Sequence, residues 1–203
     1  PLILLVRPIN SVFENSIDRK FFILKLEELI NLGFKNIEIP WRDDSNWLDL
    51  MSHLRSEFPQ VNLGSASNLN RKSIDDSLKL NLDFSMMKFW DRNLFSYSKK
   101  KKQLLIPGII SLKNLQDAIS LECNIVKIYP INDKENALKI YNFNKEVTFI
   151  AAGGLSTLDI QKYKLYGYGG IVIGEKGFNE NIIDVTVYNW ASKNLTQIKF
   201  PNL

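Results

Sequence analysis

The 203-residue sequence predicts an α/β protein, a (β/α)8 TIM barrel formed by a single domain over residues 1–203. Three observations predict this fold. Short apolar segments recur along the chain, and amphipathic segments lie between most of them. The number of apolar segments is eight, the number of parallel strands that closes a barrel. No linker rich in Pro, Gly or Ser interrupts the pattern, and a chain of this length usually forms one domain.

The predicted strands are short runs rich in branched and other apolar residues. They are Leu2–Val6, Asn36–Pro40, Val61–Ala66, Asp83–Met87, Gln103–Ile106, Ile125–Tyr129, Thr148–Ala151 and Gly170–Ile173. Strands that alternate with helices pair in parallel, which also allows a doubly wound open sheet. The first strand of such a sheet normally leads into a glycine-rich phosphate loop, but here Arg7-Pro-Ile-Asn10 follows it. The barrel is therefore the favoured arrangement.

The predicted helices carry apolar residues three and four positions apart. They are Phe22–Leu32, Trp47–Phe58, Ser73–Leu80, Leu112–Leu121, Lys134–Tyr141 and Thr157–Leu165, with Asp91–Lys102 as the least clear pattern. Residues that favour helix ends agree with these limits. Gly33 follows the first helix, and Ser156-Thr-Leu-Asp159 has the form of a capping box.

The composition is that of an ordinary soluble globular protein, with 45% apolar residues, 24% charged residues and a formal net charge of +4. The densest positive run, Lys99–Lys102, fits a solvated helix end, so we expect no nucleic-acid partner. One cysteine, Cys123, excludes an intrachain disulfide and fits the reducing cytoplasm. No apolar run approaches the roughly 20 residues of a membrane span, so no membrane partner is expected.

Histidine and cysteine are too scarce for several kinds of site. With His53 and Cys123 as the single examples of their types, a zinc site or a Ser-His-Asp triad has no ligand or residue set. The chemistry must therefore come from Lys, Glu, Asp, Arg, Ser or Tyr, and we expect no metal and no organic cofactor.

Two ionisable residues stand in the middle of apolar strands. Lys127 lies between Val126 and Ile128, and Glu38 lies between Ile37 and Ile39. Because successive side chains alternate, the four apolar neighbours would face the helices while Glu38 and Lys127 would face the barrel interior. Burial lowers the pKa of a lysine, and the neutral amine is a nucleophile for carbonyl carbon. A structural ion pair is the alternative interpretation.

In a TIM barrel the active site lies at the carboxyl ends of the strands. Polar residues and glycines of this chain occur on or after these ends. They are Arg7, Glu38, Arg42, Ser65, Ser67, Lys88, Pro107, Gly108, Lys127, Gly153, Gly154, Gly174 and Glu175. Gly153 and Gly154 also fit an ordinary turn from a strand to a helix. The convergence of the whole set predicts one site with Lys127 and Glu38 at its centre.

These residues carry a family resemblance that extends over almost the whole chain and fades after about Phe178. The motifs are Leu-Leu-Val-Arg7, Ile-Glu38-Ile-Pro-Trp-Arg42, Gly64-Ser-Ala-Ser67, Ile-Pro107-Gly108, Val-Lys127-Ile-Tyr-Pro130 and Ala-Gly153-Gly154. In this order and spacing they resemble the class I 2-keto-3-deoxy-6-phosphogluconate (KDPG) and 4-hydroxy-2-oxoglutarate aldolases.

The resemblance implies a lyase that cleaves a 4-hydroxy-2-oxo acid to pyruvate and an aldehyde, of the kind used in Entner–Doudoroff sugar-acid catabolism. Lys127 would form a Schiff base with the keto carbon, and Glu38 would transfer protons. Arg42 and Ser67 would hold the carboxylate or neighbouring oxygens, and Pro107 would shape the pocket wall. Such aldolases are commonly homotrimers. The large aromatic residues Trp41, Trp47, Phe89, Trp90 and Phe95 would supply the subunit interface or pack helices onto the barrel.

Some positions depart from the family pattern. Ala152 stands where a threonine is usual, and Glu175 stands where a serine helps to bind phosphate, so we expect a weak preference for phosphorylated substrates. Lys176 could compensate if it turned inward. Lys88 is the second lysine at a strand end and is the alternative nucleophile.

Three other functions stay open. They are a barrel enzyme that acts on a phosphorylated metabolite without an imine, a non-catalytic relative of the aldolases, and a partner-binding barrel with Trp41, Trp47 and Trp90 at its interface.

Overall fold

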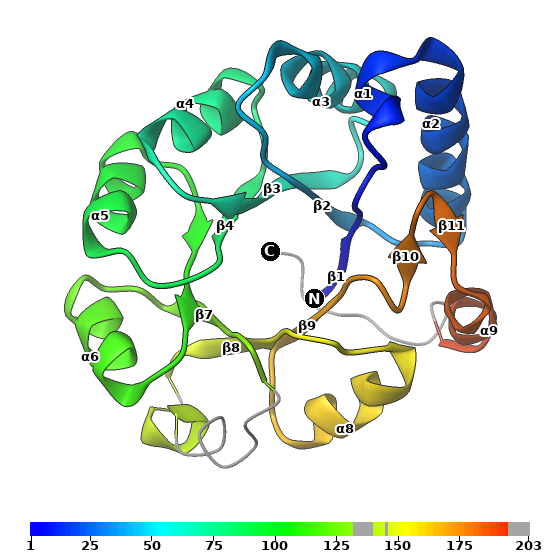
Figure 1. The fold of residues 1–203 in the computed structure, drawn as a ribbon. Helices are drawn as coiled ribbons and strands as arrows, with labels where there is room; N and C mark the ends of the chain where they lie inside the picture. The colour runs from blue at the N-terminus through cyan, green and yellow to red at the C-terminus, as the bar shows by residue number, and fades with distance from the viewer. Residues whose placement is uncertain (132–139, 145, 195–203) are drawn as a thin grey trace.

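The computed structural model describes residues 1–131, 140–144 and 146–194. Figure 1 shows a ring of helices around a central ring of strands, which is the predicted TIM barrel in a single domain. Among the described helices, none is long and apolar enough to cross a membrane.

All neighbouring strands of the barrel sheet are parallel. They are β1 (Leu2–Leu5), β2 (Asn36–Pro40), β3 (Asn62–Asn68), β4 (Phe84–Met87), β5 (Leu105–Ile106), β6 (Gly108–Ile109), β7 (Ile125–Ile128), β8 (Thr148–Ala151) and β9 (Gly170–Ile173). Their order is β5-β4-β3-β2-β1-β9-β8-β7-β6. This order excludes the doubly wound alternative, because the first strand, β1, pairs with the last strand of the sheet, β9, as well as with β2.

The barrel closes at Pro107, which separates β5 from β6. β5 pairs with β4, and β6 pairs with β7, so the two short strands act as two halves of one barrel strand. Proline has no N–H to donate to a neighbouring strand. Its carbonyl still accepts a hydrogen bond from the Lys127 N–H at 2.8 Å. The strand predicted over Gln103–Ile106 thus continues beyond the proline to Ile109.

The helices connect the strands on the outside of the barrel (Figure 1). They are α1 (Ser11–Glu14), α2 (Ser16–Asn31), α3 (Ser45–Glu57), α4 (Arg71–Lys79), α5 (Arg92–Lys101), α6 (Leu112–Ser120), η1 (Thr157–Asp159), α8 (Ile160–Leu165) and α9 (Val185–Asn194). A small hairpin of β10 (Phe178–Asn179) and β11 (Ile182–Ile183) precedes α9. Most of the predicted helix Lys134–Tyr141 lies outside the described residues.

Side-chain oxygens at the helix starts satisfy backbone N–H groups that have no partner within the helix. Asp44 accepts from the N–H of Trp47, Asp91 from that of Leu94, and Ser111 from that of Asn114. The least clear helical pattern, Asp91–Lys102, is thus a helix with an aspartate cap. The predicted capping box at Ser156 and Asp159 is also present.

The apolar residues form two clusters, one on each side of the strands. The outer cluster packs the helices onto the sheet and includes Ile37, Ile39, Val126 and Ile128. The inner cluster fills the barrel and consists of Ile3, Phe84, Met86, Ile106, Ile150, Ala152 and Val172. This separation is the alternation that the sequence predicted for the strands that carry Glu38 and Lys127.

The large aromatic residues suggested as an interface mostly pack within the chain. Trp47 is fully buried and Phe95 nearly so. The indole N–H groups of Trp41 and Trp90 donate to Asp76 and Asp117 at 3.0 and 2.8 Å. Trp47 therefore cannot belong to a partner-binding surface, contrary to expectation, whereas Trp41 and Trp90 are half-buried.

Candidate active site

A cavity of about 500 Å³ opens at the carboxyl ends of the barrel strands. Its lining residues come from β1, β2, β7, β8 and β9 or from the turns that follow these strands. Seven of the predicted site residues line it. They are Arg7, Glu38, Lys127, Gly153, Gly154, Gly174 and Glu175.

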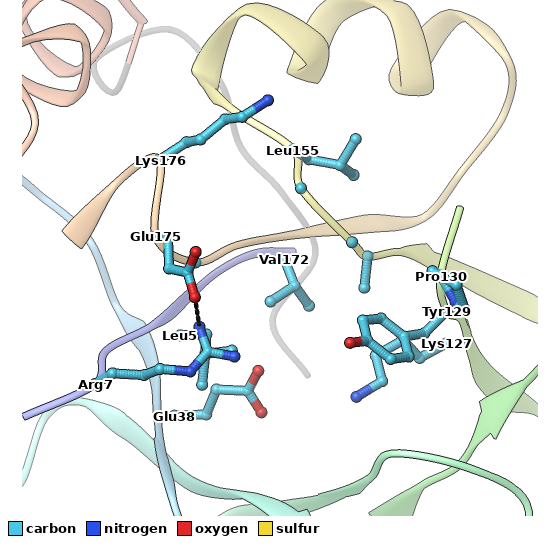
Figure 2. Close-up of a pocket in the computed structure, with 14 residues that line it drawn as sticks. Leu5, Arg7, Glu38, Lys127, Tyr129, Pro130, Leu155, Val172, Glu175 and Lys176 are labelled. Carbon is cyan, nitrogen blue, oxygen red and sulfur yellow. Dashed lines mark ion pairs between the residues drawn. The ribbon is translucent and has the colours of Figure 1, made fainter. Parts of the chain in front are cut away.

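Glu38 and Lys127 stand on opposite walls of the cavity. Figure 2 shows the Lys127 amine and the Glu38 carboxylate pointing towards one another from β7 and β2. The exposed fractions of Lys127 and Glu38 are 7% and 1%, and no group of the described residues hydrogen-bonds to the Glu38 Oε2 atom. A buried carboxylate oxygen without a partner is costly unless a ligand, a water molecule or a proton satisfies it.

Burial shifts both pKa values towards the neutral forms. Loss of water around Glu38 raises its pKa from 4.5 to about 6, although the positive charges of Lys127 and Arg7 act in the opposite direction. Loss of water around Lys127 lowers its pKa, and the charge of Arg7 lowers it further, whereas Glu38 raises it. The pair can thus supply a neutral amine and a carboxyl group that exchanges protons near neutral pH.

Arg7 and Glu175 form a second pair at the outer part of the cavity. The Arg7 Nη1 atom lies 3.7 Å from the Glu175 Oε1 atom, and Figure 2 shows the guanidinium between Glu175 and Glu38. Both side chains are well exposed. Lys176 also lines the cavity and extends away from Arg7 and Glu38 in the same view.

Gly153 and Gly154 form the turn between β8 and η1. Their φ angles of 116° and 64° lie in the region that favours glycine. A side chain on Gly153 would also approach the backbone of Pro130 and Ile131 to 3.2 Å. The two glycines therefore let the chain turn closely past the end of β7, and they expose backbone groups to the cavity.

Several cavity residues were missed in the sequence. Tyr129 lies two positions after Lys127, and Leu5 lies two positions before Arg7, so strand alternation places each on the same face as a predicted site residue. The Tyr129 ring centroid is 5.6 Å from the Lys127 Nζ atom, and its hydroxyl points into the cavity (Figure 2). Strict use of the two-residue period would have found both residues.

Six predicted site residues lie outside the cavity lining, namely Arg42, Ser65, Ser67, Lys88, Pro107 and Gly108. Arg42 donates to Asp44 at 2.8 Å and to Asn10 at 2.9 Å, and its guanidinium lies over the Phe13 ring. Ser67 has a φ of 57° and lies where the register between β3 and β4 shifts. Pro107 acts on the site indirectly, because its carbonyl holds the Lys127 N–H.

Two of these residues, Lys88 and Ser65, make other contacts away from the cavity. Lys88 is exposed, does not belong to the cavity lining, and has its Nζ atom 5.3 Å from the Phe89 ring centroid. Ser65 is buried on the helix-facing side of β3, where it hydrogen-bonds with Ser77 and Ser85 at 2.8 and 3.0 Å. The expectation that Ser65 belongs to the site was therefore wrong.

In the part of the chain that the structure describes, no group of three or more His, Cys, Asp or Glu residues could hold a metal ion. The Cys123 thiol is buried, which raises its pKa to about 11.

Solved structures with the same fold include aldolases and other enzymes. KDPG aldolase from Legionella pneumophila, with pyruvate captured as a covalent carbinolamine, is 20% identical with a TM-score of 0.76, over 93% of this chain and 88% of that chain. The native KDPGal structure is 14% identical with a TM-score of 0.80, over 98% and 97%. 3-Hexulose-6-phosphate synthase from Salmonella typhimurium is 11% identical with a TM-score of 0.67, over 97% and 98%.

Likeness at such low identity shows the fold alone, and no curated protein matches the chain significantly. The family comparison goes further. The model of the KDPG and KHG aldolases matches residues 12–190, which include Glu38, Lys127 and the glycine turn. The chain therefore belongs to the KDPG and KHG aldolase family.

Proposed function

We propose that the protein is a Schiff-base aldolase that cleaves a 4-hydroxy-2-oxo acid to pyruvate and an aldehyde. The observation that carries this proposal is the buried Lys127 amine, with its lowered pKa, opposite the Glu38 carboxyl group. The similar L. pneumophila enzyme, which holds pyruvate as a covalent carbinolamine, supports the same chemistry.

Lys127 begins the reaction. Its neutral amine attacks the keto carbon, C2, and the carbinolamine that forms loses water to give a protonated imine. The Tyr129 ring beside the Nζ atom favours this cation, because the face of an aromatic ring attracts positive charge. The imine cation is the electron sink for the next step.

Glu38 transfers the protons, directly or through water. Its carboxylate takes the proton of the 4-hydroxyl group while the bond between C3 and C4 breaks, and the electron pair of that bond moves into the imine. The aldehyde leaves, and the acid form of Glu38 then protonates C3 of the pyruvate enamine. Water finally releases pyruvate from Lys127. A carboxyl pKa of about 6 suits a group that must both accept and donate a proton.

The remaining predicted site residues would bind the substrate. Arg42 and Ser67 would hold the carboxylate, for which Arg42 must exchange Asp44 and Asn10 for the ligand. Arg7, Gly153, Gly154 and Gly174 line the outer part of the cavity and would face the aldehyde half. Pro107 would keep β7 in place through its carbonyl.

Borohydride reduction in the presence of pyruvate tests the proposal. We expect one reduced pyruvyl group on the peptide that contains Lys127, and complete loss of labelling in Lys127→Ala. Lys88→Ala is the matched control, because Lys88 lies at another strand end but outside the cavity lining, and it should be labelled normally. Labelling that survives Lys127→Ala would move the nucleophile to Lys88 or end the aldolase assignment.

The same experiment separates the main rival functions. A barrel enzyme that acts on a phosphorylated metabolite without an imine has precedent for this fold in 3-hexulose-6-phosphate synthase, and such an enzyme would not be labelled. A non-catalytic relative would show neither labelling nor release of pyruvate from a 4-hydroxy-2-oxo acid.

We further propose a cytoplasmic homotrimer. The family resemblance supports the trimer, and an apolar stripe on α2 offers a surface for it. Ile17, Phe21 and Leu24 are four and three positions apart on this helix and are 76%, 49% and 51% exposed. Light scattering at micromolar concentration decides the assembly, since a mass near 23.4 kDa would show a monomer.

A further inference from the structure

The outer part of the cavity carries charges that the proposed reaction steps do not use. Arg7 is the single arginine among the described lining residues, and Glu175 faces it at 3.7 Å. Figure 2 shows this ion pair on the side of the cavity above Glu38. The guanidinium that could bind an anionic substrate group there already has a carboxylate of the chain beside it.

The backbone holds Glu175 at this place. The turn after β9 is closed by hydrogen bonds from the N–H groups of Gly177 and Phe178 to the carbonyl of Gly174, at 2.7 and 3.0 Å. A side chain on Gly174 would lie 3.3 Å from the Arg7 Nη1 atom, so the glycine allows the guanidinium to approach the turn.

The fold has little need of this ion pair. The two side chains are 45% and 72% exposed, and exposed ion pairs contribute little to stability. The consequence of the pair lies in the charge that it presents to a ligand.

A phosphate dianion and a hydroxyl group would meet this pair differently. The phosphate would compete with Glu175 for Arg7 and would be repelled by the carboxylate. A hydroxyl group can donate a hydrogen bond to Glu175 and leave the ion pair intact. Ala152 adds no hydrogen-bonding side chain to this part of the wall.

We propose that Glu175 sets the substrate class. It favours 4-hydroxy-2-oxo acids whose distal end carries uncharged hydroxyl groups over the phosphorylated forms of the same acids. This inference rests on the proposed aldolase activity. Glu175 acts in it as a specificity-determining residue that takes no part in bond cleavage.

The test compares kcat/KM for KDPG and for its unphosphorylated analogue. We expect the wild-type protein to prefer the unphosphorylated acid. Glu175→Gln should raise kcat/KM for KDPG by about 10-fold and should lower the value for the unphosphorylated analogue, because an amide oxygen accepts the hydroxyl hydrogen bond more weakly than a carboxylate does. Added salt should raise the wild-type rate with KDPG, because it screens the repulsion, and should do so much less in Glu175→Gln.

Glu180→Gln is the matched control. Glu180 is an exposed carboxylate between β10 and β11 that does not line the cavity, so its removal makes the same change in net charge away from the site. The ratio of kcat/KM for KDPG to kcat/KM for its unphosphorylated analogue should be the same in this variant as in the wild-type protein. A ratio that shifts equally in both variants would overturn the inference, because net charge alone would then explain the preference.

Other outcomes would also overturn it. A wild-type preference for KDPG that Glu175→Gln leaves unchanged would show that Lys176 or backbone amides bind the phosphate. Borohydride trapping with pyruvate, which has no distal end, reports separately on the aldolase function. Absence of trapping in every variant would overturn the aldolase proposal itself, whereas normal trapping with an unchanged substrate ratio would overturn the role of Glu175 alone.

Discussion

The cavity contains two pairs of opposite charge that differ in depth. Lys127 and Glu38 stand in the middle of strands and are 7% and 1% exposed. Arg7 and Glu175 follow the ends of strands, and their side chains are 45% and 72% exposed. Burial shifts both pKa values of the deep pair towards the neutral forms, because water no longer stabilises the charges.

In the roles proposed above, the deep pair carries out the chemistry and the outer pair selects the substrate. The deep pair can exchange protons near neutral pH, which bond cleavage requires. The outer pair lies in contact with solvent, where salt screens its interactions. It can repel or attract the end of a substrate. Four predictions test this contrast.

The largest effect is expected from the deep carboxyl group. Glu38→Gln keeps the size of the side chain but cannot accept the proton of the 4-hydroxyl group, so kcat should fall by about 10²–10⁴-fold. The rate of pyruvate release at saturating substrate measures kcat. Trapping of pyruvate on Lys127 should persist in this variant at high enzyme concentration, because the nucleophile remains. A variant with nearly normal kcat would show that another group, such as the Tyr129 hydroxyl in the same cavity, transfers the proton.

The deep carboxyl group should also make stability depend on pH. The folded protein binds the Glu38 proton more tightly than the unfolded chain, since the pKa rises from 4.5 to about 6. Between these values the folded state binds more protons, so the free energy of unfolding should fall as pH rises through this window. The total loss is about 2 kcal/mol. Below pH 4.5 both states are protonated and the loss is absent.

Urea unfolding of wild type and Glu38→Gln between pH 4 and about 7 measures this loss. Glu38→Gln has no carboxyl group to titrate, so it should become more stable relative to wild type as pH rises through the window. Parallel curves for the two proteins would contradict the raised pKa.

A smaller effect is expected when Arg42 and Arg7 are replaced, and it concerns the trapping of pyruvate. Pyruvate has a carboxylate but no distal end, so Arg42→Met should weaken its trapping by about 10-fold, as expected for loss of a charge-assisted contact. Arg7→Met should change trapping much less. Dependence of borohydride labelling on pyruvate concentration measures both. The opposite result would place the carboxylate beside Arg7, and Arg42 would then serve to join the turn after β2 to Asn10 and Asp44.

The sequence predicted the strands and the deep pair because both depend on local pattern. Runs of branched apolar residues mark the strands, and a charge within such a run stands out. Alternation then predicted that Glu38 and Lys127 face inward while Ile37 and Val126 face the helices, as the structure shows.

The parts that could not be predicted depend on contacts between distant segments. The Arg7–Glu175 pair depends on the conformations of the turns after β1 and β9, which the strand pattern does not determine. The partners of Arg42 come from α1 and from the turn before α3. The burial of Trp47 depends on how α3 packs, so a count of aromatic residues overestimated the free apolar surface.

The smallest effect is expected on the stability of the protein when a residue of the outer pair is replaced. Arg7→Met and Glu175→Gln should each change the free energy of unfolding by less than about 0.5 kcal/mol, because exposed ion pairs gain little and are screened by salt. Arg55→Met provides the comparison. The Arg55 side chain is 22% exposed, lies 3.0 Å from Asp83, and donates to the Val61 carbonyl at 2.7 Å.

Its loss should cost about 1–3 kcal/mol, since it removes the ion pair with Asp83 and the hydrogen bond to the Val61 carbonyl. Urea unfolding at pH 7, in low and in high salt, ranks the three variants. A loss at Arg7 or Glu175 as large as that at Arg55 would show that the outer pair stabilises the barrel. The contrast between a deep pair for chemistry and an outer pair for selection would then need a structural role for the outer pair.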